Sequence, residues 1–120
     1  MATLASVEEY LQTINTYVNE INNGQNYEEY TRPLSLKIAL ASEIINSGNL
    51  VRYVNMISDA ANQIHDAKDN EQIRMGFYLF NVSVDMLREY LAAHWWQYGG
   101  QGSRRAIDTV PKVNKLLVTS

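Results

Sequence analysis

The sequence predicts an all-α fold, a bundle of four main helices followed by a short C-terminal helix. Three observations support this prediction. Apolar residues recur at spacings of three and four along four segments, which is the period of a helix with one buried face. Capping residues and glycines stand at the ends of these segments. No segment alternates apolar and polar residues as a strand does, and no hairpin turn joins β-branched runs.

The first helix is predicted to begin at a capping box formed by Ser6 and Glu9, and to end at the Asn-Asn-Gly sequence 22–24. The second is predicted from Pro33, which suits a first helical turn, to Ser47-Gly48. This second helix is apolar over much of its circumference, so we expect it to be central, with Leu36, Leu40 and Ile44 widening its buried stripe.

The third helix is predicted to be capped by Asn49, and alanines 60 and 61 would allow a close helix approach. Asp69 and Gln72 resemble a further capping box, which starts a fourth helix that could run to residue 97. The stripe of this fourth helix is the strongest in the chain: Ile73, Phe77, Phe80, Val84, Leu87 and Leu91. Pro111 limits any last helix to the short stretch 111–118.

The length of 120 residues fits a single domain, 1–120, with the bundle in 1–99 and a glycine-linked basic tail in 100–120. The absence of cysteine excludes disulfides and thiolate metal sites. The start of the chain does not read as a secretory signal, and no apolar run approaches the ~20 residues of a membrane span. We therefore expect a cytoplasmic protein that does not contact a membrane.

Charge is distributed unevenly around a net value of −3. Residues 1–31 hold five acids and no Lys or Arg, whereas residues 100–120 hold four basic residues against one acid, a balance of +3. This asymmetry indicates either an acidic partner for the tail or an ordinary acidic protein whose tail is solvated.

Enzymatic constellations are nearly absent, and we expect no catalytic residue, cofactor or metal. His65, Asp66 and Asp69 could share a helix face and bind a metal, but a cap and a favourable charge at the helix end explain them more simply. Arg88 and His94 have the Arg-x-x-x-x-x-His spacing of helical ribonucleases of the HEPN group. On an unbroken helix, however, these two side chains would point about 120° apart.

A second stripe on the fourth helix is polar and consists of Arg74, Tyr78, Asn81, Asp85 and Arg88. Such a face can track a sugar–phosphate backbone, or it can be solvated with Asp85 pairing Arg88. The aromatic residues near the end of the helix can close the bundle or anchor a protein partner. The candidate protein-interface residues are Tyr78, Trp95, Trp96 and Tyr98.

Two stretches, TRPLSLKIALASEIINSGNLVRYVNMISDAA and QIRMGFYLFNVSVDMLREYL, resemble the small helical subunit of CRISPR–Cas effector complexes. They also resemble the helical C-terminal domain of the large subunit, notably of the type I-D kind. The similarity covers about residues 30–92 and rests on helix order, on Arg32-Pro33-Leu34 and on Gly76-Phe77-Tyr78-Leu79-Phe80.

The resemblance implies a non-catalytic subunit of an RNA-guided complex. Its expected partners are the backbone and large subunits, guide RNA, target DNA and further copies of itself. The basic positions that would contact nucleic acid are Arg32, Lys37, Arg52, Arg74, Arg88, Arg104 and Arg105. Two alternatives stay open: a helical adaptor that binds protein without nucleic acid, and a HEPN-like ribonuclease.

Overall fold

The structure is a computed structural model that describes residues 4–23, 37–40, 48–94 and 110–114. Apart from residues 67–69 and 110–114, these residues are helical, and they contain no strand, as predicted. The long helices are α1 (Leu4–Asn23), α3 (Val51–Asp66) and α4 (Asn70–His94). Residues 37–40 form a helical turn, and a 3-10 turn, η1 (Gly48–Leu50), precedes α3.

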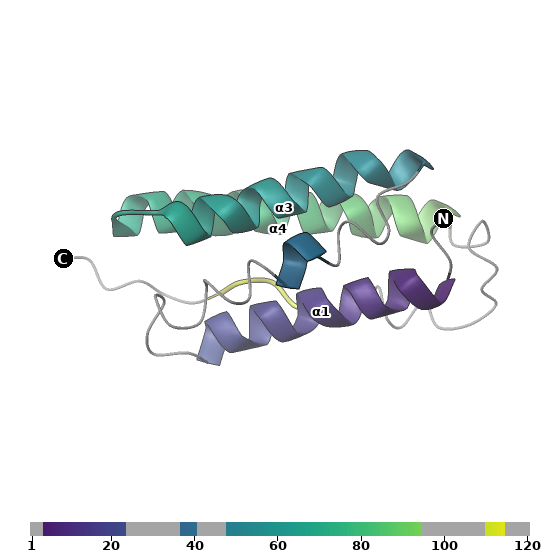
Figure 1. Ribbon diagram of the computed structural model, residues 1–120, viewed down its shortest axis with the longest axis horizontal. Coiled ribbons are helices and arrows are strands. Elements are labelled where there is room, and N and C mark those ends of the chain that lie inside the picture. The colour runs from purple at the N-terminus through teal and green to yellow at the C-terminus, as the bar shows by residue number, and fades with distance from the viewer. Residues whose placement is uncertain (1–3, 24–36, 41–47, 95–109, 115–120) are drawn as a thin grey trace.

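The three long helices pack as two layers. α3 and α4 lie side by side and antiparallel, and α1 lies across from them, antiparallel to α4 (Figure 1). The predicted stripes meet between the layers, where Ile14, Ile57, Phe80 and Leu91 are completely buried. The rings of Tyr17 on α1 and Phe80 on α4 pack with their centroids 5.0 Å apart. Burial of these apolar faces is what holds the short chain in one unit.

α3 and α4 approach each other closely at Gly76. A Cβ atom built on this glycine would lie 2.6 Å from Ile64 Cγ1 and 3.3 Å from the Ile64 backbone nitrogen. The predicted contact alanines of α3, Ala60 and Ala61, are buried as well. Small residues on both helices therefore set the spacing of this pair.

The start of α4 confirms the predicted capping pair. The backbone N–H of Gln72 donates to Asp69 Oδ1 at 2.8 Å, and the backbone N–H of Lys68 donates to Gln72 Oε1 at 2.8 Å. The Gln72 side chain thus reaches one residue further back than in the usual capping box. The first bond satisfies a donor that a helix start leaves open, and the second holds the residue before the cap against the helix.

Two other predicted helix starts are wrong. α1 begins at Leu4, so the backbone of Ser6 is already helical and Ser6 is not the cap. The N-cap position of α3 is occupied by Leu50, which makes no side-chain cap bond. Asn49 instead lies inside η1, because Gly48, with a φ of 59°, turns the chain into a 3-10 turn before α3 begins. The predicted end of α1 at 22–24 agrees with its last residue, Asn23.

Of the predicted second helix, only residues 37–40 lie within the described part of the chain, and they are helical. Ile38 is completely buried, whereas Leu40 is 63% exposed. The expectation that Leu40 widens the buried stripe is therefore wrong. Leu36 and Ile44 lie outside the described residues, as does the predicted extension of α4 to residue 97.

The predicted C-terminal helix does not form over the part that the structure describes. Residues 110–114, called the docked segment below, are not helical. They lie between α1 and α4 (Figure 1, yellow). Val110 and Val113 are buried in the same core as the helices. This part of the predicted tail consequently belongs to the bundle and does not extend from it.

Candidate functional site

The surface of α4 divides into three faces with different chemistry. One face, which includes Phe80 and Leu91, is buried in the core. A second is the predicted polar stripe, and a third faces away from α1 and is apolar. The polar stripe and the outer apolar face are the candidate sites on this helix.

The middle of the polar stripe holds the docked segment. Asn81 Nδ2 donates to the Val113 carbonyl oxygen at 2.9 Å, and the Val113 backbone N–H donates to Asn81 Oδ1 at 2.9 Å. The Arg88 guanidinium donates to the Val110 carbonyl oxygen. Asp85 Oδ2 forms an ion pair with Lys112 Nζ at 2.9 Å, and Asp85 Oδ1 lies 3.8 Å from Arg88 Nη1. The sequence pattern correctly placed these side chains on one face but did not reveal that the chain itself covers it.

α1 holds the docked segment from the opposite side. Asn22 Nδ2 donates to the Lys112 carbonyl oxygen at 3.0 Å, and the Asn114 backbone N–H donates to Asn22 Oδ1 at 2.9 Å. Nothing in the sequence singled out Asn22, because its partner lies about ninety residues away in the chain. The pairing of Asp85 with Arg88, considered from sequence as part of a solvated face, is present together with these contacts.

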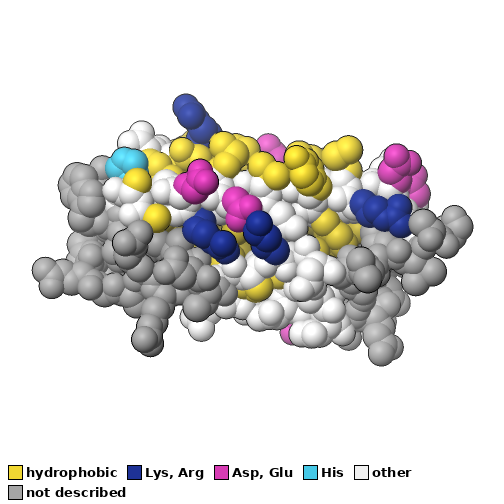
Figure 2. Space-filling view, turned by 180° about the vertical axis from the view of Figure 1, so that it is seen from behind, with side chains coloured by type: hydrophobic (Ala, Val, Ile, Leu, Met, Phe, Trp, Pro, Cys, Tyr) yellow, Lys and Arg dark blue, Asp and Glu magenta, His cyan; other side chains and the backbone are white. Residues whose placement is uncertain are grey.

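The outer face of α4 exposes a line of apolar side chains, here called the outer stripe: Met75, Leu79, Val82 and Met86. They are spaced four, three and four residues apart and so follow one side of the helix. Met75 is 52% exposed, Leu79 38% and Met86 37%, and Val82 is half-buried. Figure 2 shows hydrophobic side chains gathered in a band along this edge of the molecule, with basic and acidic side chains next to one another below it.

Tyr78, one of the predicted protein-interface residues, lies beside the outer stripe and is 64% exposed. Its spacing places Tyr78 in the polar stripe, and its exposure is what an anchor residue needs. The other predicted interface residues, Trp95, Trp96 and Tyr98, lie outside the described residues.

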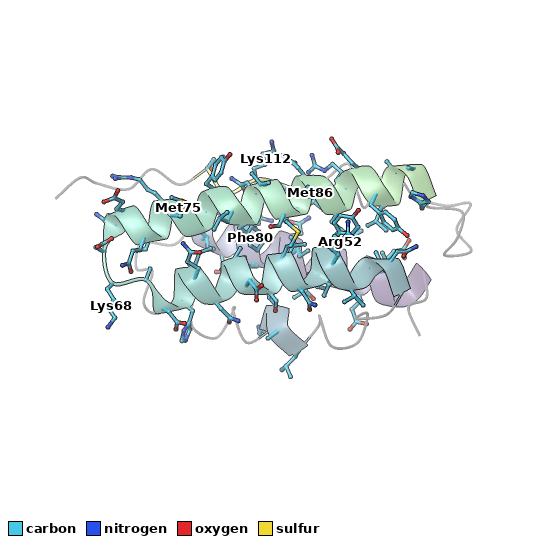
Figure 3. All side chains as sticks on the ribbon, turned by 90° about the horizontal axis from the view of Figure 1, so that it is seen from above. Arg52, Lys68, Met75, Phe80, Met86 and Lys112 are labelled. Carbon is cyan, nitrogen blue, oxygen red and sulfur yellow. The ribbon has the colours of Figure 1, made fainter. Side chains whose placement is uncertain are left out.

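The predicted basic positions do not form one cluster over the described part of the chain. Three of them are exposed but lie on different elements: Lys37 in the turn 37–40, Arg52 at the start of α3 and Arg74 near the start of α4. Arg88 is half-buried against the docked segment. Figure 3 places Arg52 on α3, away from Lys68 at the opposite end of the pair of helices. Arg32, Arg104 and Arg105 lie outside the described residues.

Arg52 borders an open pocket at the start of α3, with a volume of about 320 Å³. Gly48, Asn49, Val51, Tyr53 and Tyr90 line the pocket together with Arg52. The rings of Tyr53 and Tyr90 pack with centroids 5.1 Å apart. A guanidinium beside aromatic rings can contact a phosphate and a stacked base, so Arg52 has the setting that the nucleic-acid prediction needs.

Both members of the ribonuclease-like pair bind groups of their own chain. His94 stacks on Tyr90 with centroids 4.4 Å apart, and its Nδ1 lies 3.0 Å from the Tyr90 carbonyl oxygen. The Arg88 guanidinium binds the Val110 carbonyl.

The histidine and aspartates considered as metal ligands have structural partners. His65 Nδ1 lies 2.7 Å from Asp66 Oδ1, and Asp69 caps α4. Among the described residues no three acidic, histidine or cysteine side chains come together as a metal site. Within the same residues, no helix has the length and apolarity required to cross a membrane.

Comparison of the chain with protein-family models, with curated proteins and with solved structures finds no match in any of the three.

Proposed function

We propose that this protein is a non-catalytic assembly subunit that binds a neighbouring protein through the outer stripe of α4. The observation that carries the proposal is the exposure of Met75, Leu79 and Met86 in one line on a well-formed helix. A continuous line of apolar side chains that stay partly exposed to solvent is typical of a binding surface. Methionine suits this use, because its unbranched side chain adapts to the shape of a partner.

The spacing of the outer stripe indicates the kind of partner. Steps of four, three and four residues are those with which one helix packs against another. The stripe runs from Met75 to Met86, a rise of about 16 Å along the helix. A partner helix of similar length with an apolar seam would cover it.

Charge beside the stripe adds a second criterion. Glu71 and Glu89 are both exposed and stand eighteen residues apart, which is about five helical turns. They therefore lie along the same line, next to the outer stripe and on the same side of it as Tyr78. The partner helix should carry basic residues on the flank that faces these two carboxylates.

The resemblance described above makes the proposal specific. It would place this chain in the cytoplasm as a small subunit of a CRISPR effector complex, packed against the backbone and large subunits and further copies of itself. The all-α architecture and an exposed helix face for neighbouring subunits support this version. It predicts that short guide RNA and the backbone-forming subunits co-purify with the chain.

Purification of the tagged chain from its native cell, with and without nuclease, tests the proposal. Leu79→Glu puts a charge in the middle of the outer stripe and should remove the partner, whereas Asn62→Glu, an exposed site of α3, should keep it. The expected result is one defined protein partner, retained after nuclease, lost with Leu79→Glu and kept with Asn62→Glu. A partner that binds both variants equally would contradict the proposal.

Direct contact with nucleic acid is a second candidate function, and the setting of Arg52 favours it. Arg52 is exposed and shares a pocket with Tyr53, so the two residues offer an ionic contact and an aromatic ring to a nucleotide. Arg52→Glu should then weaken association with single-stranded DNA or RNA and reduce its salt dependence. Arg88 is a poor choice for this test, because its substitution would also remove a hydrogen bond to the docked segment. Unchanged affinity and salt dependence with Arg52→Glu would argue against the nucleic-acid role.

A further inference from the structure

The docked segment is recognised through its backbone. In an extended chain the N–H and C=O of one residue point to one side, and those of its neighbours point to the other. Asn81 binds both backbone groups of Val113, and Asn22 binds the carbonyl before it and the N–H after it. Two carboxamides on opposite helices thus occupy both edges of the segment, as neighbouring strands would in a sheet.

Side chains add selectivity to this backbone recognition. Val110 and Val113 enter the core, and Lys112 pairs with Asp85 at 2.9 Å. Between the two valines, Lys112 remains largely exposed apart from its ion pair. The groove between α1 and α4 therefore fits an extended peptide with apolar residues at its first and fourth positions and a basic residue at its third.

All the contacts just described come from five consecutive residues, 110–114. Residues 95–109 connect this segment to the end of α4, and they include Gly99, Gly100 and Gly102. Another copy of the chain carries an identical segment, so the groove would make the same bonds with it. Exchange of an identical element between copies requires no new complementary surface. The segment of the second copy only has to compete with the chain's own segment for the groove.

We propose that the groove between α1 and α4 is a peptide site that accepts residues 110–114 of a second copy of the chain. Copies would then be linked by exchange of docked segments. This link uses the inner edge of α4 and α1, so it is independent of the outer stripe. Leu79→Glu should leave the exchange intact even if it removes every other partner.

Carbodiimide coupling tests the proposal, because it joins a carboxylate to an amine only when the two are in contact. Asp85 and Lys112 meet this condition at 2.9 Å. The wild-type chain should give an Asp85–Lys112 isopeptide bond, identified by mass spectrometry. To separate the two sources, a chain with Asp85→Asn is mixed with a ¹⁵N-labelled chain with Lys112→Gln. Neither variant can form this bond alone, within one copy or between identical copies.

The mixture decides between the outcomes. The proposal predicts a covalent heterodimer that joins Asp85 of the labelled chain to Lys112 of the other and increases with protein concentration. A wild-type chain that couples only within the monomer, with no heterodimer in the mixture, would overturn the exchange. Absence of the isopeptide bond from wild type and mixture alike would overturn the groove itself. The Leu79→Glu substitution, placed in both chains of the mixture, should not change the yield.

Discussion

Substitution of Gly76 by alanine tests the close approach of α3 and α4. The new Cβ atom would lie 2.6 Å from Ile64 Cγ1, whereas carbon atoms in good contact are about 3.5–4.0 Å apart. Ile64 cannot turn away easily, because a β-branched side chain in a helix has one strongly preferred χ1 rotamer. The Ile64 backbone nitrogen, 3.3 Å from the new atom, limits a shift of the helix itself.

Two effects of opposite sign act on the free energy of unfolding. Alanine is more favourable than glycine inside a helix by about 1 kcal/mol. An added methyl group in a well-packed core costs about 1–3 kcal/mol. We expect the steric effect to be larger, because the contact is with a stiff, buried side chain. The predicted net result of Gly76→Ala is a loss of up to about 2 kcal/mol of stability.

Urea unfolding, monitored by circular dichroism, measures this change. The same substitution is also made in a chain that carries Ile64→Ala. Removing Cγ1 relieves the clash, so Gly76→Ala should now stabilise the chain by up to about 1 kcal/mol. Gly48→Ala is the control, since no atom lies within 4 Å of its new Cβ and its φ of 59° alone should cost about 1–2 kcal/mol in both backgrounds. If Gly76→Ala stabilised the wild-type chain as much as the Ile64→Ala chain, the reasoning would be refuted.

Three further substitutions test other contacts. Asn81→Ala leaves the backbone groups of Val113 without their partner, so we expect faster hydrogen exchange at the Val113 amide and a loss of about 1–3 kcal/mol. Unchanged exchange would contradict the clamp. Asp69→Ala removes the cap of α4 and should lower stability by about 1 kcal/mol, unlike Asp59→Ala at an exposed position within α3, as thermal unfolding would show. Phe80→Ala should cost about 3–5 kcal/mol in urea unfolding, and a loss below 1 kcal/mol would mean that the ring is not in the core.

The helices and their buried faces could be predicted because each rests on a local pattern. The stripe of α4, from Ile73 to Leu91, repeats at helical spacing over about five turns. Its members Phe77, Phe80, Val84, Leu87 and Leu91 are all buried. Burial of a periodic face needs no knowledge of what covers it. Helix starts were less predictable, because the 3-10 turn at Gly48 displaced the expected cap of α3 without leaving a mark in the apolar pattern.

The docked segment could not be predicted from the same patterns. Pro111 and the glycines before it indicated a break in helix formation, but the partners of Val113 lie on α4 and those of Asn114 on α1. A side-chain amide that binds a distant backbone has no sequence period. The polar stripe of α4 could be predicted from its helical spacing. The segment that binds to it could not, because that contact leaves no periodic pattern in the sequence.

The outer stripe was overlooked for a different reason. Met75, Leu79 and Met86 occur among the core residues of α4 in the sequence, and an apolar residue reads as buried unless the position of the neighbouring helices is known. One signal was available: apolar residues cover more of α4 than a single buried face requires. Gly76, too, could have indicated the close contact with α3, since glycine inside a helix needs a compensating reason.

The central claim is that the outer stripe binds a protein, and methionine oxidation tests it most directly. Met75 and Met86 are exposed in the isolated chain, so a mild oxidant should convert both to the sulfoxide, as mass spectrometry would record. In the complex with the co-purified partner, we predict that both are oxidised markedly more slowly, and that Leu79→Glu restores the rates of the isolated chain. Equal oxidation of Met75 and Met86 in the free and the fully bound chain would contradict the claim.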